Sequence, residues 1–430
     1  MDWFFIGWNL GSILLLVVLF IVGILYFQGF FGRYDRFHVK NLPPTNAPNF
    51  ELTLASLSDA FITHGRVVGF WEGADAIHQA RLDAIASAEK SIQFETYFMT
   101  PGDRADNFAQ ALRERAQAGV AVQVIADHHG SKDLSDSYWQ RLREAGILIT
   151  QFNQFTWKDP LSHLRRNHRK LLVIDGHSAL IGGAGISDHW DGLPEFGDTE
   201  PWLDYEIRIE GAVVMRLKGI FFQHWLDAGG VVDFAQDPLE FVQNSNDPMV
   251  LIAAGEDPSM RDSSIRALYQ SAIRAARERV WITSPYFLPD PGTREILIET
   301  RQKGIDVRIL TMGPHTDKPY VRYTSRERYR QLLQGDVAIH EYQPSMMHAK
   351  MLLVDDSWVS FGSANFDPRS FFQNDELNVA TAELDVVQQF DDYFLRALRK
   401  SDRVYYKEWQ KRSFKERFVG KFWLLFYWQL

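Results

Sequence analysis

His168-Arg-Lys170-Leu-Leu-Val-Ile-Asp175 and His348-Ala-Lys350-Met-Leu-Leu-Val-Asp355 are two copies of one pattern in a chain of 430 residues, and a Gly-containing turn follows each copy. In an extended chain, side chains two positions apart project to the same side, so the His and the Lys of each copy lie together. The Asp has the opposite parity and falls where the predicted strand, 171–174 or 351–354, enters a turn, so it is predicted to brace the strand end. Two copies with matched surroundings predict two halves of one site.

The sequence around the two copies repeats as well. Residues 88–98 match residues 276–287 if one inserted residue is allowed, and each stretch is predicted to be a helix end followed by a buried strand. The strands predicted over 119–124 and 304–309 also correspond, and each precedes its own His-x-Lys strand. Strands that alternate with helical stretches favour a largely parallel sheet with helices on its faces. We therefore predict a duplicated α/β domain.

Several further motifs support a family resemblance. The double His-x-Lys motif, the turn Gly362-Ser-Ala-Asn365, the segment Phe366-Asp-Pro-Arg369-Ser370 and the segment Asn374-Asp-Glu376-Leu-Asn378 together resemble the phospholipase D superfamily. The run Glu341-Tyr-Gln-Pro-Ser-Met-Met-His348-Ala-Lys350 resembles the bacterial cardiolipin synthases in particular. The resemblance covers residues 60–430, and it implies two α/β/α halves, 61–245 and 246–410, that share one active site.

The repeated residues suit phosphodiester chemistry. Cleavage needs a nucleophile, an acid for the leaving alkoxide and positive charge on the non-bridging oxygens, and two His with two Lys supply all three. The resemblance implies that one His forms a phosphohistidine and that the other acts as general acid and then as base. We assign the nucleophile to His168 and the acid–base role to His348, with Lys170 and Lys350 on the phosphoryl oxygens. Asp175 and Asp355 complete the catalytic motif, and the scheme needs no metal and no other cofactor.

Other residues are implied to support this machinery. Each His needs a partner that fixes its tautomer, and in the family this is a carboxylate further downstream. The matching positions are Asp204 and Glu376, for which a solvated loop acid is the alternative. Asn365, together with Ser363 in the same turn, is implied to support or bind the phosphate. The first half has Gly185 at the position of Asn365, so either a backbone N–H replaces the amide there or that half binds phosphate more loosely.

Two more groups of polar residues have two interpretations each. His128 and His129 follow a predicted strand, where α/β proteins place ligands, and His315 lies in the corresponding stretch of the second half. His163, Arg165 and Arg166 precede the first motif. Each group could line the substrate pocket. The alternatives are an exposed polar turn for the histidines and a basic surface cluster for the arginines.

The N-terminus predicts a membrane anchor. Residues 3–32 carry no charge, and residues 10–27 alone are long enough to cross about 30 Å of hydrocarbon. A transmembrane helix over residues 1–32 is favoured over a signal peptide, because no basic cluster precedes the apolar stretch and no cleavage site follows it. A buried core helix is the other alternative.

Arg33, Arg36 and Lys40 follow the helix, which predicts a single-pass protein of the bacterial inner membrane with its catalytic part in the cytoplasm. Residues 33–60, with Pro43, Pro44 and Pro48, are predicted to form a semi-rigid juxtamembrane linker.

The C-terminal residues 411–430 carry a second pattern that is typical of membrane contact. Phenylalanines recur every four residues from Phe414 to Phe426, with Lys and Arg between them. This pattern suits an amphipathic helix in the headgroup region of a bilayer. The alternative is a terminal helix docked on the catalytic core.

Composition narrows the class of protein. The formal net charge of -9 and the pI near 5.8 disfavour a general nucleic-acid-binding protein, although some relatives of this superfamily are nucleases. The chain contains no Cys, so disulfides are excluded, but this does not discriminate between compartments. Because the net charge of the chain is negative, the attraction to anionic lipids would have to come from the basic stretches at residues 33–40 and in the tail.

The resemblance therefore implies a membrane-anchored phosphatidyltransferase. It would move the phosphatidyl group of phosphatidylglycerol to a second alcohol, giving cardiolipin and glycerol, with an anionic phospholipid and the bilayer as its partners and no nucleic acid. A phospholipase D hydrolase, or a synthase that uses phosphatidylethanolamine as donor, would have the same catalytic residues. Outside enzymes, the alternative is a noncatalytic, membrane-tethered phosphate-binding protein in which Gly185 marks decay of the site. The sequence indicates no oligomeric state.

Overall fold

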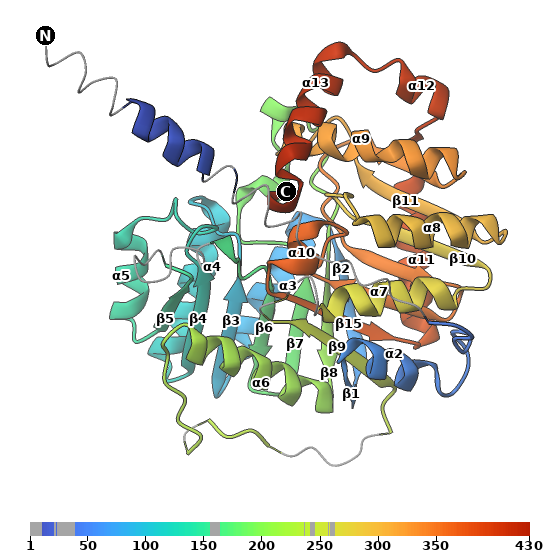
Figure 1. Ribbon diagram of the computed structural model, residues 1–430. Coiled ribbons are helices and arrows are strands. Elements are labelled where there is room, and N and C mark those ends of the chain that lie inside the picture. The colour runs from blue at the N-terminus through green and yellow to red at the C-terminus, as the bar shows by residue number, and fades with distance from the viewer. Residues whose placement is uncertain are drawn as a thin grey trace, which may run out of the picture.

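The computed structural model describes residues 11–20, 23, 39–154, 164–235, 237–240, 246–256, 258 and 263–430. Two similar halves make up most of it (Figure 1). The first half contains β2 (Arg66–Glu72), α3 (Ala74–Ala86), β3 (Ser91–Thr96), α4 (Asp103–Gln117), β4 (Ala121–Asp127), α5 (Asp136–Glu144), β5 (Leu148–Phe152), β6 (Leu171–Ile174), β7 (Ser178–Gly182), β8 (Tyr205–Glu210) and α6 (Ala212–Asp227), with 3-10 turns η2 (Asp188–Asp191) and η3 (Pro194–Phe196) between β7 and β8.

The second half repeats this order. It contains β9 (Met249–Gly255), α7 (Ser264–Ala275), β10 (Arg279–Thr283), α8 (Pro291–Gln302), β11 (Asp306–Met312), α9 (Pro319–Gln334), β12 (Ala338–Tyr342), β13 (Met351–Val354), β14 (Trp358–Gly362), β15 (Glu376–Thr381) and α11 (Leu384–Arg399), with the short helix α10 (Pro368–Phe372) between β14 and β15. Outside the repeat lie α2 (Phe50–Ser58), β1 (Phe61–His64), β16 (Ser401–Arg403), α12 (Tyr406–Gln410), α13 (Phe414–Trp423) and the 3-10 turn η4 (Leu424–Gln429). The predicted duplication is confirmed.

The strand order is the same in both halves. The first sheet runs β2-β8-β7-β6-β3-β4-β5, and the second runs β9-β15-β14-β13-β10-β11-β12 with β1 and β16 added at its edges. The two His-x-Lys motifs therefore precede equivalent strands, β6 and β13, in the middle of their sheets. All four residues of each strand are buried, as expected for apolar runs covered on both faces.

The prediction of a largely parallel sheet is wrong. Among the described strands, β3–β4–β5 and β10–β11–β12 pair in parallel, while the remaining neighbours pair antiparallel. The reason is the length of the connections, because parallel neighbours need a crossover helix whereas β6 and β7 are joined by a tight turn. Asp175 and Gly176 both have positive φ there, 53° and 68°, and His177 N donates to Ile174 O, which is the hairpin geometry expected of an Asp-Gly pair.

Two predicted boundaries also differ from the structure. Strand β1 pairs with β9 of the second sheet, so the sheet of the first half begins at β2 rather than at residue 61. The segment predicted as a linker over 33–60 is docked on the second half where it is described. Leu42 is buried and accepts a hydrogen bond from Arg277, and Thr45 donates to Asp355. The prolines restrict this segment, and these contacts fix it.

Three hydrophobic clusters make up the core. One lies under α3, α4 and α5 of the first half, and one lies under α7, α8 and α9 of the second half and also contains Ala74, Ile77 and Trp190 of the first. The third contains residues of β6–β8 and α6 together with residues of β13–β15 and α11, so both halves contribute to one core. The active-site motifs lie at the end of this shared core.

Among the residues that the structure describes, no helix combines the length and apolar character needed to cross a bilayer. The predicted span over 10–27 lies partly outside those residues, since 10, 21, 22 and 24–27 are not among them. Residues 11–20 within it are helical, and their side chains are exposed.

Candidate active site

The two motifs are brought together by backbone contacts that cross between the halves. His168 N donates to Asp375 O at 2.9 Å, and His348 N donates to Leu203 O at 2.8 Å. Isolated bridges join Asn167 with Asp375 and Leu203 with Met347. The first motif therefore lies beside the segment that leads into β15 of the second half, and the second motif lies beside the segment that leads into β8 of the first half.

This arrangement crosses the His–carboxylate pairs. His168 Nδ1 lies 2.9 Å from Glu376 Oε1 and 3.0 Å from Oε2, and His348 Nδ1 lies 3.0 Å from Asp204 Oδ2. Both acids are buried and neither is the solvated loop residue of the alternative interpretation. The expectation that each partner lies downstream of its own His fails for His348, whose partner comes 144 positions earlier. Each half supplies the tautomer-fixing acid of the other.

Each lysine donates to the backbone carbonyl of the His it accompanies in sequence, and Lys350 also lies against the imidazole. Lys170 Nζ donates to His168 O at 2.7 Å, and Lys350 Nζ lies 3.0 and 3.1 Å from the ring nitrogens of His348 and also donates to its carbonyl. Both lysines are at most 3% exposed. The hydroxyl of Tyr205, which sequence reasoning missed, donates to the carbonyl of Lys350 and fixes this strand from the first half.

Burial keeps both imidazoles neutral in the free site. Burial, with the charges of Lys170 and Lys350, lowers the pKa of His168 well below its ordinary value. Burial and the Lys350 ammonium lower the pKa of His348 to about 3, against the hydrogen bond to Asp204. With Nδ1–H donating to the carboxylate, Nε2 of each ring is unprotonated, which is the form that a nucleophile or a general base requires, and in His348 this nitrogen lies 3.1 Å from Lys350 Nζ.

Burial also shifts the pKa values of the lysines and of the carboxylates. Burial lowers the pKa of Lys170 to about 8 and that of Lys350 to about 7, although Glu376 and Asp204 favour their charged forms. Burial raises the pKa of Glu376 to about 7, against Lys170 and the hydroxyls of Ser363 and Ser370. Burial acts the same way on Asp204, but the hydrogen bond from His348 and the nearby Lys350 bring its pKa below the usual value. An anionic phosphodiester would restore full charge to both lysines by adding the negative charge that the site lacks.

Asp175 and Asp355 lie where the strand-end interpretation placed them. Asp175 accepts hydrogen bonds from the backbone N–H groups of residues 89, 90 and 91, and Asp355 accepts them from residues 277, 278 and 279. In each half the Asp ties the turn after the His-x-Lys strand to the start of the neighbouring strand, β3 or β10. These carboxylates are committed to the backbone, so their grouping with the catalytic residues is not supported by the geometry.

The acids are held differently in the two halves. Ser363 and Ser370 donate to Glu376 at 2.5 and 2.6 Å, so Ser363 supports the carboxylate. In the first half the indole N–H of Trp190 donates to Asp204 at 3.0 Å, and Trp190 also packs edge-on against His348 with ring centroids 5.2 Å apart. Trp190 occupies the position that corresponds to Ser370, which is how the repeat could have revealed both residues.

Gly185 is a packing position. A Cβ at this residue would lie 2.5 Å from Phe98 O and 3.2 Å from the Trp190 ring, so no side chain fits. Its carbonyl accepts from Arg81, as does that of Ala184. The missing Asn is therefore explained by the aromatic packing around Trp190 and Phe98.

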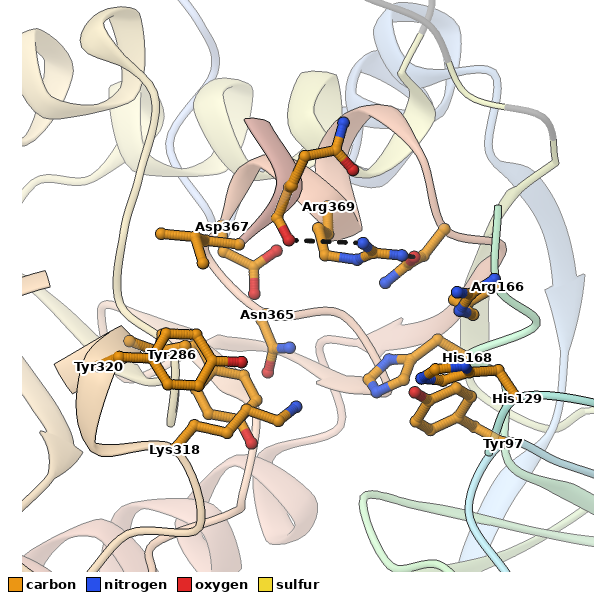
Figure 2. A pocket seen from close by; sticks show the side chains of 14 residues that line it. Tyr97, His129, Arg166, His168, Tyr286, Lys318, Tyr320, Asn365, Asp367 and Arg369 are labelled. Carbon is orange, nitrogen blue, oxygen red and sulfur yellow. Dashed lines mark hydrogen bonds between the residues drawn. The ribbon is translucent and has the colours of Figure 1, made fainter. Parts of the chain in front are cut away.

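A cavity of about 220 Å³ opens onto His168 (Figure 2). This volume is far more than the 10–15 Å³ or so that one water needs, so it accommodates a headgroup. Asn365 lines it, and among the described residues its Oδ1 has no hydrogen-bond partner, which suits a residue that awaits a ligand. The remaining lining residues are Tyr97, His129, Arg166, Tyr286, Lys318, Tyr320, Val321, Asp367, Arg369, Asn374, Gln429 and Leu430.

Some sequence predictions about this cavity agree with the structure and others do not. His129 and Arg166 line it, whereas Arg165 pairs with Asp375 at 2.7 Å. Sequence reasoning did not single out Lys318, Asp367 or Arg369 as pocket residues. Arg369 could have been found, because it stands in the quoted segment 366–370 and its counterpart in the first half is His189. Among the described residues, no three His, Asp or Glu side chains are grouped to hold a metal ion.

Comparison with known proteins identifies the family. The model described as "Cardiolipin synthase, PLD-like domain" matches residues 82–189 and 269–398, which together are more than half of the chain and contain both His-x-Lys motifs. The chain belongs to this cardiolipin synthase family of phospholipase D-like proteins. The resemblance seen in the sequence is thereby confirmed.

Named relatives agree with this family. The chain is 32% identical to cardiolipin synthase 2 of Bacillus anthracis over 85% of its own length and 70% of the relative's. It is 33% identical to a cardiolipin synthase of Geobacillus kaustophilus over 77% of its own length and 66% of the relative's. It thus spans about two thirds of the length of these relatives. The crystal structure of phosphatidylserine synthase from Haemophilus influenzae has the same fold, with a TM-score of 0.70 at 13% identity over 88% of this chain and 99% of that one.

Proposed function

We propose that this protein is a phosphatidyltransferase of the cardiolipin synthase type, which joins two phosphatidylglycerol molecules and releases glycerol. The observation that carries the proposal is the crossed arrangement of the two His-x-Lys motifs, His168 with Glu376 and His348 with Asp204, in a chain that belongs to this family. The relatives named cardiolipin synthase and the fold of a phosphatidylserine synthase support a phospholipid substrate.

The proposed reaction has two steps. In the first, Nε2 of His168 attacks the phosphorus of the donor, the bond from phosphorus to the glycerol oxygen breaks, and His348 gives that oxygen a proton. In the second, His348 takes the proton of the acceptor hydroxyl, whose oxygen attacks the phosphorus and displaces His168. Lys170 and Lys350 neutralise the phosphoryl oxygens throughout.

The neutral state of His348 in the free site fits this sequence of events. Burial, and after it the charge of Lys350, lower its pKa to about 3 before substrate binds, so it is neutral in the free site. An anionic phosphodiester would offset the part of this shift that Lys350 causes. Binding of the donor would therefore raise the pKa of His348 and prepare the general acid. The acid is charged only when there is a leaving group to protonate.

The proposal includes attachment to the bacterial inner membrane. The uncharged segment over residues 3–32 and the basic residues that follow it support a single N-terminal span with the catalytic part on the cytoplasmic side. The exposed phenylalanines Phe414, Phe418 and Phe422 of α13 support a second contact with lipid.

Mixed-micelle assays with phosphatidylglycerol labelled in its phosphate test the function. The wild-type protein is expected to form cardiolipin and, after acid-free denaturation, to carry label on His168. His168→Ala and His348→Ala are each expected to lose at least about 10³-fold in turnover, by analogy with other acid–base and nucleophile deletions. Phosphatidic acid as the sole product would identify a hydrolase. Cardiolipin formed only when phosphatidylethanolamine is added would identify a different donor. Lipid binding without turnover would indicate a noncatalytic protein.

A further inference from the structure

The cavity beside His168 is more cationic than the transfer reaction alone requires. Arg166, Lys318 and Arg369 line it, although neither lysine of the motifs does, and the only acid among the lining residues of the described chain is Asp367. Burial raises the pKa of Asp367 to about 7, so this carboxyl is only partly ionised near neutral pH. The lining therefore carries a positive surplus in a protein whose net charge is -9.

Arg369 is held in place by neutral groups. Its guanidinium donates to Leu164 O at 2.9 Å, to Asn374 Oδ1 at 3.3 Å and to Gln429 O at 3.5 Å. Burial and the neighbouring Arg166 guanidinium lower the pKa of Arg369, so the two cations repel each other within one cavity wall. Two like charges kept together at a buried wall are stabilised when an anion binds between them.

These cations break the internal symmetry of the molecule. The positions that correspond to Arg166 and Arg369 in the other half are Met346 and His189. Each half contributes one His, one Lys and one acid to the residues around the reacting phosphate. The additional cations occur on one side only, so they serve something other than the transferred phosphoryl group.

We propose that Arg166 and Arg369, with Lys318, form a second phosphate subsite that binds the phosphodiester of the acceptor lipid. The inference rests on the proposed function. The acceptor hydroxyl of phosphatidylglycerol is joined to its own phosphate by a short glycerol unit, so a subsite beside the transfer position holds the hydroxyl in reach of the phosphohistidine. Planar guanidinium groups suit such an anion because they bind it through two parallel hydrogen bonds.

The subsite selects the acceptor as well as placing it. Water and free glycerol carry no phosphate and gain nothing from these cations, whereas an anionic lipid gains two charge-assisted contacts. The enzyme then favours lipid-to-lipid transfer over hydrolysis and over return of the phosphatidyl group to glycerol.

The test compares two acceptors on one donor. Cardiolipin formation uses phosphatidylglycerol as acceptor, and incorporation of labelled glycerol into phosphatidylglycerol uses free glycerol, while the donor step is common to both. In Arg166→Gln and Arg369→Gln, cardiolipin formation is expected to fall roughly tenfold or more at subsaturating acceptor, as for loss of a charge-assisted hydrogen bond. Glycerol exchange is expected to stay within about twofold, and the ratio of phosphatidic acid to cardiolipin is expected to rise.

The design separates misfolding from loss of the subsite. Glycerol exchange measured on the same sample reports the folded, donor-competent fraction, and Arg369→Lys is expected to recover part of the cardiolipin formation because it keeps the charge. Arg141→Gln, at an exposed arginine of α5, is the matched control. Equal losses in exchange and in cardiolipin formation would place these arginines on the donor and overturn the inference. A wild-type protein that exchanges glycerol but forms no cardiolipin would also overturn it, whereas one that does neither would overturn the proposed function itself.

Discussion

Single residues in this site are defined by partners that lie far away in the sequence. The His-x-Lys spacing predicts that imidazole and ammonium lie together, and the structure shows this contact for His348 and Lys350, while Lys170 donates to the backbone carbonyl of His168. The pairing of His168 with Glu376 and of His348 with Asp204 is not local, since it depends on how one half is docked on the other. The repeat therefore reveals the members of the site but not their pairing.

The strand-end aspartates give the first prediction at this scale. Asp175→Ala removes the acceptor of three backbone N–H groups, two at exposed residues and one, that of Ser91, partly buried, so the free energy of unfolding should fall by about 2 kcal/mol. The turnover number of the protein that remains folded should stay within a few-fold, because the carboxylate does not face the reacting groups. Thermal unfolding and kinetics on the same preparation check this, with Asp175→Asn as the milder variant. An unchanged melting temperature together with lost turnover would instead place Asp175 in the chemistry.

The lysines give a pH dependence. A lysine is charged below its pKa, and the values of about 7 for Lys350 and about 8 for Lys170 mean that both charges are lost as the pH rises through this range. The free enzyme should then bind the phosphodiester less well, and kcat/KM should fall on the alkaline side of neutral rather than near the ordinary lysine value of about 10.4. Kinetics at low substrate concentration between pH 6 and 10 measure this fall.

Lys350→Arg is the informative comparison for that profile. A guanidinium stays charged throughout the range, so the part of the alkaline fall due to residue 350 should disappear even if overall activity is lower. A wild-type profile that stays level up to pH 10 would mean that the lysines remain charged in the free site.

At the scale of single elements, turn chemistry was more predictable than strand direction. Asp175-Gly176 indicates a tight hairpin, and that hairpin makes β6 and β7 antiparallel. The alternation of strands and helices suggested a parallel sheet because it does not show that β6 to β8 follow one another without crossover helices. In the same way Pro43, Pro44 and Pro48 indicate a stiff segment, but only the contacts of Leu42 and Thr45 show that it is docked.

Helix α13 combines the two interpretations made of the tail. It packs along α9, with Gly420 against the carbonyl of Tyr323 and Trp423 against the ring of Tyr320, and η4 returns the chain to α10 (Figure 1). On its other side Phe414, Phe418 and Phe422 are 82, 61 and 48% exposed, beside the exposed Lys415, Arg417 and Lys421. A docked helix thus presents an aromatic and basic face to its surroundings.

This face gives a prediction at the element scale. In a protein that lacks residues 1–32, replacing the three phenylalanines by Ser should lower partition into vesicles that contain phosphatidylglycerol by about tenfold or more, since each exposed ring would no longer enter the interface. Vesicle sedimentation measures the partition. The matched control is Leu384→Ser, an exposed apolar residue at the start of α11. Equal partition of both variants would show that α13 only completes the fold.

At the scale of the whole molecule, duplication has produced one site that neither half contains. Each imidazole takes its carboxylate from the other half, and the core formed by β6–β8, α6, β13–β15 and α11 is shared. Both motifs of the site come from one chain, so a second chain has no residue to add to it.

Mixtures of purified His168→Ala and His348→Ala proteins should therefore form no more cardiolipin than the two proteins assayed apart. A chain that carries both substitutions is the background control, and mixing should be done in detergent so that both variants share the same micelles. Activity restored toward one quarter of the wild-type level or more would mean that halves from different chains assemble the site, as in exchange of identical elements between protomers.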